Sequence, residues 1–190
     1  MTAPVLVGIT GATGVIYGVA LLRRLKALGQ PCHLIVSEWG AQTLALETDI
    51  DIDAVRALAD RAYSNKDLAA AAASGSFVTR GMVIAPCSVK TLSGIAHSFT
   101  CNLMIRAADV TLKERRPLVL VFRETPLHRG HIELMARAAD LGAVLLPPVP
   151  AFYNRPATLD DIVGHTVGKI LDQLGIDDEG AARWDGPPRG

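Results

Sequence analysis

Short apolar runs recur along the chain, separated by longer stretches with helical spacing. The run Leu118–Phe122 holds five apolar residues and no polar one, which is typical of a strand buried on both faces of a parallel sheet. Similar runs predict further strands at residues 5–10, 32–37, 82–86 and 143–146, with a short one at 62–64. The pattern therefore predicts six strands, most of them buried.

Between these runs, apolar residues recur every three or four positions, which predicts helices. The first such segment has Val15, Val19, Leu22 and Leu25 on one face and ends before Gly29, a favoured residue just beyond a helix end. Further helices are predicted up to residue 46 and at 53–61, 89–97, 102–114, 132–141 and 159–174. Repeated strand–helix units indicate an α/β fold, a three-layer Rossmann-like doubly wound parallel sheet.

Composition narrows the class of protein. A length of 190 residues predicts a single α/β domain at 1–176, followed by an irregular tail at 177–190. The 19 basic and 19 acidic side chains cancel, so no net field favours nucleic acid. No apolar run reaches the ~18 residues of a membrane span. Three widely spaced cysteines do not form a disulfide framework, and we expect a cytoplasmic protein.

Two charged residues follow the most apolar strand directly. Arg123 and Glu124 stand at the carboxyl end of the 118–122 run, before Thr125-Pro126 interrupts the pattern. Ligands of open α/β sheets bind at that edge, so this pair is a candidate for an anionic substrate and a proton. The alternative is a surface ion pair, which contributes little.

Two strand-to-helix junctions are candidates for phosphate binding. The first, Gly8 to Gly18, is rich in glycine and can bring backbone amides and a helix N-terminus close to a phosphate. Its spacing matches neither a dinucleotide fingerprint nor a Walker loop, so packing alone could also explain the glycines. The second junction has hydroxyls at Ser88 and Thr91, for which an ordinary N-cap is the alternative.

The sequence offers little for metal or thiol chemistry. His128 and His131 lack the His-Glu-x-x-His arrangement and no Cys-x-x-Cys occurs, so no metal site is predicted. Cys87 follows a proline and is more simply a buried core thiol than a nucleophile.

Taken together, the segments resemble the UbiX family of flavin prenyltransferases over nearly the whole chain. The resemblance is specific because many motifs occur in one order. They are Gly11-Ala12-Thr13-Gly14 with Tyr17-Gly18, Leu46-Glu47-Thr48-Asp49, Ser74-Gly75-Ser76-Phe77, Pro86-Cys87-Ser88, Arg106 to Asp109, Lys113 to Leu120, Arg123 to His128, and Pro150 to Tyr153.

The resemblance implies strand order 3-2-1-4-5-6 and reduced FMN as the bound cofactor. It also implies transfer of a dimethylallyl group from dimethylallyl phosphate to flavin N5 and C6, without metal. The product would serve a separate UbiD-type decarboxylase. A homo-oligomer, typically a dodecamer with sites built across subunits, is implied as well.

The resemblance also assigns roles to residues of this chain. The residues that match its FMN-contacting segments are Gly11, Ala12, Thr13, Ser37, Ser88, Val89, Lys90, Thr91 and Arg123. Those that match the surroundings of the prenyl phosphate are Glu47, Arg106, Lys113, Glu124, Tyr153 and Lys169, with Ser74 and Gly75 in the small-residue loop. The catalytic candidates are Glu124 as base, Thr13 as its proton relay, Glu47 and Lys113.

Two positions depart from the family pattern. Thr13 stands where a serine is frequent, which keeps the hydroxyl but adds a methyl group beside the relay. Lys169 stands where an arginine is frequent, which keeps the charge but loses the bidentate fork. Two other functions are weighed against the transferase: a flavin-containing cysteine decarboxylase, whose Pro-x-Met-Asn-x-x-Met-Trp segment is absent at 126–133, and a flavodoxin-like FMN electron carrier.

Overall fold

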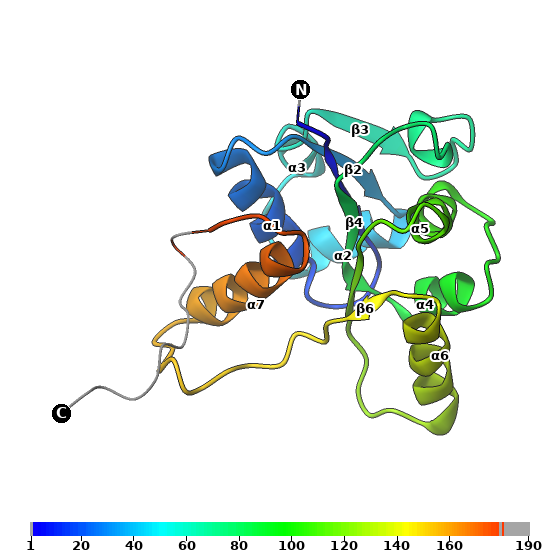
Figure 1. Ribbon diagram of the computed structural model, residues 1–190. Helices are drawn as coiled ribbons and strands as arrows, with labels where there is room; N and C mark the ends of the chain where they lie inside the picture. Colours follow the sequence, from blue (N-terminus) through cyan, green and yellow to red (C-terminus); the bar gives the residue numbers. More distant parts are fainter. Residues whose placement is uncertain (1, 179, 181–190) are drawn as a thin grey trace.

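Six parallel strands form the centre of the molecule. The structure is a computed structural model that describes residues 2–178 and 180. The strands lie in the order β3-β2-β1-β4-β5-β6 (Figure 1), which confirms the predicted order and fold class. Their bounds are β1 Val5–Ile9, β2 Cys32–Val36, β3 Arg61–Ser64, β4 Gly81–Cys87, β5 Leu118–Phe122 and β6 Val144–Leu145.

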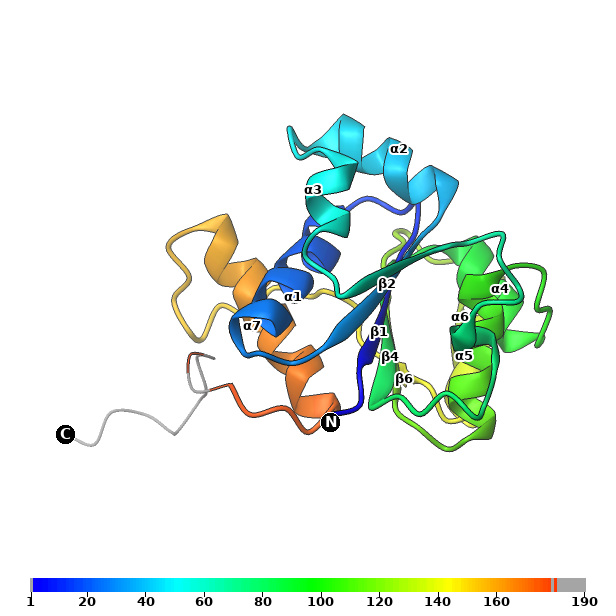
Figure 2. The same ribbon diagram turned by 90° about the horizontal axis from the view of Figure 1, so that it is seen from above.

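Helices cover both faces of this sheet, and Figure 2 shows the two layers from above. One layer comprises α1 (Val15–Ala27), α2 (Glu38–Glu47), α3 (Ile52–Arg56) and α7 (Leu159–Gln173). The other comprises the short 3-10 helix η1 (Ala71–Ala73), α4 (Val89–Ala96), α5 (Leu103–Lys113) and α6 (Arg129–Asp140). No helix within residues 2–178 is both long and apolar enough to cross a bilayer.

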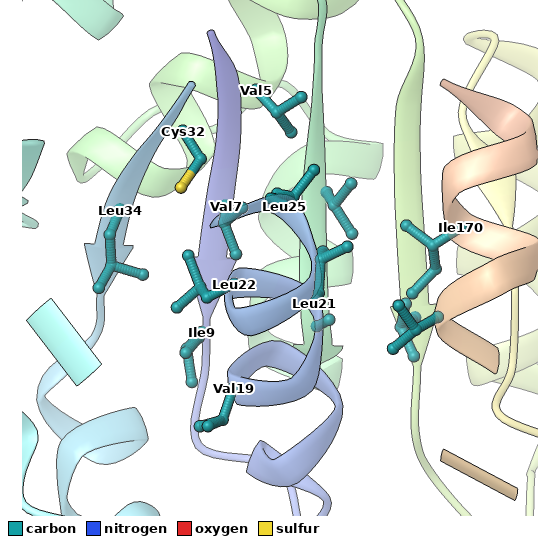
Figure 3. Packing of buried hydrophobic residues seen from close by; sticks show 14 of the residues in the cluster. Val5, Val7, Ile9, Val19, Leu21, Leu22, Leu25, Cys32, Leu34 and Ile170 are labelled. Carbon is teal, nitrogen blue, oxygen red and sulfur yellow. The ribbon is translucent and has the colours of Figure 1, made fainter. Parts of the chain in front are cut away.

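Each strand contributes alternate residues to two separate cores. Val5, Val7 and Ile9 of β1 pack against α1, whose Leu22 lies beside them in Figure 3. Leu6, between them in sequence, packs into the core on the α4 and α5 side. Successive strand side chains point to opposite faces, so burial on both faces requires the uninterrupted apolar runs seen in the sequence.

Two predicted elements are clearly shorter in the structure. The helix expected at 53–61 ends at Arg56, because residues 57–60 turn back toward β2. There the Asp60 carboxylate accepts a hydrogen bond from the Cys32 amide at 2.8 Å, and Lys26 donates to the Ala57 carbonyl at 3.0 Å. The strand expected at 143–146 has only two residues, because the Ala143 amide still bonds to the end of α6.

The α6 helix, by contrast, begins earlier than expected. It starts at Arg129 rather than at residue 132, with His128 as its N-cap. Its first turn is mostly solvent-exposed, so the apolar periodicity used for the prediction is absent there.

Part of the predicted tail packs on the domain. Ile176, the last residue of the predicted domain, is buried, and Asp178 of the tail receives two hydrogen bonds from the guanidinium of Arg24 on α1. Most of the tail expected at 177–190, namely 179 and 181–190, lies outside the described residues. The domain division at 176 stays a prediction.

Candidate functional site

A cavity of about 440 Å³ opens at the carboxyl edge of the sheet, where the parallel strands end. Ligands of open α/β sheets bind at this edge, and the volume suits a small cofactor. Thirteen residues line it: Thr10, Gly11, Ser37, Glu38, Trp39, Asn65, Lys66, Ser88, Lys90, Thr91, Asn102, Met104 and Ile105.

Three helix N-termini converge on this cavity. Their N-cap residues Ser37, Ser88 and Asn102 begin α2, α4 and α5, and all three line the wall. Each side-chain oxygen accepts a hydrogen bond from an amide of its own first turn, at 2.9, 3.4 and 3.0 Å respectively. Helix N-termini favour anions, and Lys66 and Lys90 add positive charge. The cavity is therefore suited to a phosphate group.

A buried threonine fixes the floor of the cavity. The Thr10 hydroxyl donates to the Pro86 carbonyl at 2.6 Å and accepts from the Ser88 amide at 2.9 Å. These bonds hold the end of β1 against the end of β4, so the loops that follow both strands start from a fixed position. Thr10 belongs to the strand predicted at 5–10, and the sequence pattern did not distinguish it from its apolar neighbours.

The glycine-rich junction after β1 is tied to the end of α2. Glu47, at the end of α2, accepts hydrogen bonds from the Gly14 amide at 2.8 Å and the Val15 amide at 3.2 Å. A carboxylate at a helix N-terminus is favourable, so Glu47 stabilises the first turn of α1. These two amides are thus engaged by the protein itself. That Gly11, Ala12 and Thr13 contact FMN, and that Glu47 lies near the prenyl phosphate, stays a prediction.

The two charged residues after β5 lie at the same edge. Glu124 accepts a hydrogen bond from the Thr125 amide at 3.0 Å, and Arg123 bonds through its own amide to the Cys87 carbonyl. Burial raises the pKa of the Tyr17 phenol, and the positive charge of Arg123 opposes that rise, which places the guanidinium near α1. Thr13 is exposed in the loop before α1, and its relay with Glu124 stays a prediction.

The sequence prediction missed several residues of the cavity wall. Trp39 is 63% exposed and lies against the first loop: a side chain on Gly11 would collide with the Trp39 Cβ. Asn102 carried a readable signal, because an asparagine before an apolar periodic segment is a typical N-cap. Asn65, Lys66, Met104 and Ile105 gave no signal, since they reach the wall only through the packing of β3 and α5.

Four predicted substrate residues lie away from this cavity, along α5 and the loop at 74–77. Arg106 donates to the Ala73 carbonyl at 3.2 Å and pairs with Asp109 at 3.1 Å. Lys113 pairs with Glu114 at the end of α5, next to Gly75. Ser74 begins the same loop.

Arg116 holds this loop in place. Its guanidinium donates to the Gly75 carbonyl at 2.9 Å and to the Phe77 carbonyl at 2.8 Å. The loop is therefore anchored to the residues that connect α5 with β5, and its backbone position depends on a side chain 41 residues away from Gly75.

Two further predicted substrate residues lie on the opposite face of the sheet. Lys169 is an exposed residue of α7, and Tyr153 belongs to the segment before that helix. Figures 1 and 2 place α7 and α5 on opposite sides of the sheet. One chain therefore does not bring Tyr153 and Lys169 together with Arg106 and Lys113.

The buried cysteines have the properties of core residues. Burial raises the pKa of the Cys32 thiol to about 11, and the charge of Asp60 adds to that rise. Cys87 is fully buried, and burial raises its pKa still further. Neither thiol is disposed to act as a nucleophile at neutral pH.

Known proteins match this chain over most of its length. The sequence profile of the Flavoprotein family matches residues 2–171. The flavin prenyltransferase UbiX of Escherichia coli K12 is 56% identical over 184 residues, which cover 95% of this chain and 97% of the relative.

Two solved structures share the fold closely. The crystal structure of AnUbiX (PadA1) in complex with FMN and dimethylallyl pyrophosphate has a TM-score of 0.96 at 44% identity, covering 98% of this chain and 99% of the other. The dodecameric FMN-dependent UbiX-like decarboxylase of Escherichia coli O157:H7 has a TM-score of 0.94 at 48% identity, covering 96% and 100%.

Proposed function

The chain belongs to the UbiX flavin prenyltransferases of the flavoprotein family, and from this premise we propose its reaction. The enzyme transfers the dimethylallyl group of dimethylallyl phosphate to N5 and C6 of reduced FMN and releases phosphate. The observation that carries this proposal is the convergence of three capped helix N-termini on one cavity at the carboxyl edge.

FMN suits that cavity in charge and in polarity. Its phosphate is matched by the N-termini of α2, α4 and α5, with the hydroxyls of Ser37, Ser88 and Thr91 and the cation of Lys90 nearby. Trp39, Met104 and Ile105 give the same wall an apolar part. Gly11, with Ala12 and Thr13 after it, lets the first loop approach the ligand closely.

Proton transfer in the reaction is assigned to Glu124, which follows β5, and to Thr13, which precedes α1. Reduced FMN, when bound, supplies the nucleophilic positions that accept the prenyl group. Glu124 is the base that accepts a proton as the new ring closes, with Thr13 as relay, and its hydrogen bond with the Thr125 amide holds it at the edge. Arg123 carries positive charge next to Glu124, and Glu47 fixes the loop that carries Thr13.

The phosphate of the prenyl donor needs a second cationic site. Arg106 and Lys113 belong to α5 on one face of the sheet, while Lys169 belongs to α7 on the other face and Tyr153 bonds to that helix, so a complete site requires more than one chain. We place Arg106, Lys113, Ser74 and Gly75 of one subunit opposite Tyr153 and Lys169 of another. The assembly is a homo-oligomer, a dodecamer like the Escherichia coli O157:H7 protein.

The product defines the place of the enzyme in metabolism. Prenylated FMN is the cofactor of a UbiD-type decarboxylase, which we propose as the recipient. Because Cys32, Cys87 and Cys101 are free thiols, the reducing cytoplasm is the proposed location.

Anaerobic turnover tests the proposal directly. The enzyme is mixed with reduced FMN and either dimethylallyl phosphate or dimethylallyl pyrophosphate, and the flavin is then weighed by mass spectrometry. The expected result is a gain of one five-carbon unit, with release of phosphate from the first donor or of pyrophosphate from the second. An unchanged flavin contradicts the transferase. Release of carbon dioxide from an added cysteine peptide would instead indicate a decarboxylase, and reversible one-electron reduction alone would indicate an electron carrier.

Glu124→Gln separates binding from chemistry. The amide keeps the shape of the side chain but cannot take up a proton, so FMN affinity is expected to stay within about twofold while fully cyclised product falls by about 10²-fold or more. The absorbance and mass of the flavin report both stages. Normal turnover in this variant would remove Glu124 from the reaction.

A further inference from the structure

Tyr153 is paired with a histidine that the sequence prediction did not include. Its hydroxyl lies 3.1 Å from Nε2 of His165, within hydrogen-bond distance. The two rings meet edge to face, with centroids 5.9 Å apart and planes at 84°. Tyr153 comes from the segment before α7, while His165 belongs to the helix itself, so the pair joins a loop residue to a rigid element.

The helix places His165 beside a second predicted phosphate residue. His165 and Lys169 are four positions apart on α7, and residues at this spacing share one helix face. His165 and Lys169 therefore lie on one face of α7, and Tyr153 adjoins that face through its hydrogen bond to His165. His165 is partly buried, whereas Tyr153 is 51% exposed.

A hydrogen bond between a phenol and an imidazole has two possible directions. If Nε2 accepts, the phenol proton points toward the histidine. If Nε2 carries a proton and donates, the phenol proton points away and can be donated to an anion. Only the second arrangement suits a phosphate acceptor.

Charged side chains surround His165, and they come from each of the elements packed around it. His165 lines a cavity of about 540 Å³ between α1, α7 and the preceding loop. Asp178 is paired with Arg24, and Asp161 accepts hydrogen bonds from the Ala157 and Thr158 amides, which lower its pKa. The charged neighbours of His165 in this cavity and on its helix are Arg24, Arg155, Asp160, Asp161, Asp178 and Lys169.

We propose that His165 is a positioning residue for the prenyl donor: by donating a hydrogen bond to the Tyr153 hydroxyl, it directs the phenol proton toward the donor phosphate. The inference rests on the proposed function, because it assigns Tyr153 to the phosphate of the donor. It adds His165 as the group that decides whether the Tyr153 phenol donates its proton to the donor phosphate or to the imidazole.

Equilibrium binding tests this role without turnover. Holoenzyme with oxidised FMN is titrated with dimethylallyl phosphate, and with inorganic phosphate as a second probe, by calorimetry at one fixed pH. His165→Phe keeps an aromatic ring but removes the hydrogen bond. We expect the donor Kd to rise about tenfold, the effect of one hydrogen bond to a charged group, while FMN affinity stays unchanged.

His165→Gln is the matched rescue variant. Its amide N–H can still donate to the phenol, so most of the affinity should return. The inference therefore requires a donor Kd for His165→Gln that lies closer to that of wild type than to that of His165→Phe.

A double-mutant cycle shows whether His165 acts through Tyr153. In a Tyr153→Phe background, His165→Phe should add little further loss of donor affinity. Equal losses in both backgrounds, or an unchanged Kd in His165→Phe, would overturn the inference. If wild type binds the donor but fails to prenylate reduced FMN, the proposed function fails while the role of His165 in phosphate binding is still measured.

Discussion

Ser88 combines a structural and a binding role in one hydroxyl. It accepts the hydrogen bond from the Thr91 amide that caps α4, and it faces the cavity at the carboxyl edge. The Ser88 amide in turn donates to buried Thr10. A single polar residue after a strand can therefore define where a helix begins and also contribute to an anion site.

Replacing this cap should affect both stability and affinity. Ser88→Ala is expected to cost about 1 kcal/mol of unfolding free energy and to raise the Kd for FMN by about tenfold. Thr158→Ala is the matched control, because Thr158 caps α7 with a capping box away from this cavity. Urea unfolding should show similar losses for both variants, while FMN titration changes only for Ser88→Ala. Equal FMN affinity in the two variants would contradict the phosphate site.

The buried thiol of Cys32 makes stability depend on alkaline pH. Its pKa is raised by burial to about 11 from an ordinary value of 9.0, so the folded chain holds this proton more tightly than the unfolded chain. The stability that this tighter proton binding contributes to the folded state is complete below pH 9 and is lost as the pH rises toward 11. We expect the free energy of unfolding to fall by on the order of 1 kcal/mol per pH unit in this window.

Cys32→Ala isolates the contribution of this thiol. The variant loses some packing at every pH, but its stability should fall less steeply between about pH 9 and 11 than that of wild type. Parallel curves for the two proteins would show that the thiol does not titrate in the unfolding equilibrium.

At the scale of elements, α1 packs unusually close to the sheet. Gly18 faces β4, where an added Cβ would collide with the Ala85 carbonyl and lie 2.8 Å from Cγ1 of Ile9. This approach sets the position of α1, and with it the loop that carries Gly11 and Thr13. Glu47 then fixes the N-terminal end of the same helix.

Two glycine substitutions test this packing. Gly18→Ala is expected to destabilise the protein by about 1–3 kcal/mol, because the added methyl group meets backbone rather than a flexible side chain. Gly164→Ala on α7 meets nothing within 4 Å and should stabilise by up to about 1 kcal/mol through helix propensity. Urea denaturation measures both. A Gly18→Ala protein as stable as wild type would mean that α1 can shift without cost.

At the scale of the whole molecule, the sheet separates the two groups of residues that we assign to the donor phosphate. Lys113 lies at the end of α5 on one side, and Tyr153 and Lys169 lie on the α7 side. The sheet between them is filled by buried strands and cannot be crossed by side chains. A donor site that uses both groups must therefore be shared between copies of the chain.

Subunit complementation tests a shared site. Lys113→Ala and Tyr153→Phe are each expected to lose most activity as homo-oligomers. Co-expression with two different tags gives mixed oligomers, in which some sites combine an intact Lys113 from one subunit with an intact Tyr153 from another. Prenyl transfer should return in the doubly purified fraction. Activity that stays at the level of the single variants would place each site within one chain.

The sequence by itself determined the elements, since buried parallel strands require uninterrupted apolar runs and helices a repeat of three to four residues. It also indicated Ser88 and Arg123 as candidates, because each follows a strand directly, whereas Ser37 became a candidate through the family resemblance. The tertiary structure alone decided how these elements combine. Glu47 reaches the α1 N-terminus across 33 residues of sequence, Trp39 meets Gly11, and His165 meets Tyr153. Such contacts depend on the packing of helices onto a twisted sheet, which no local pattern encodes.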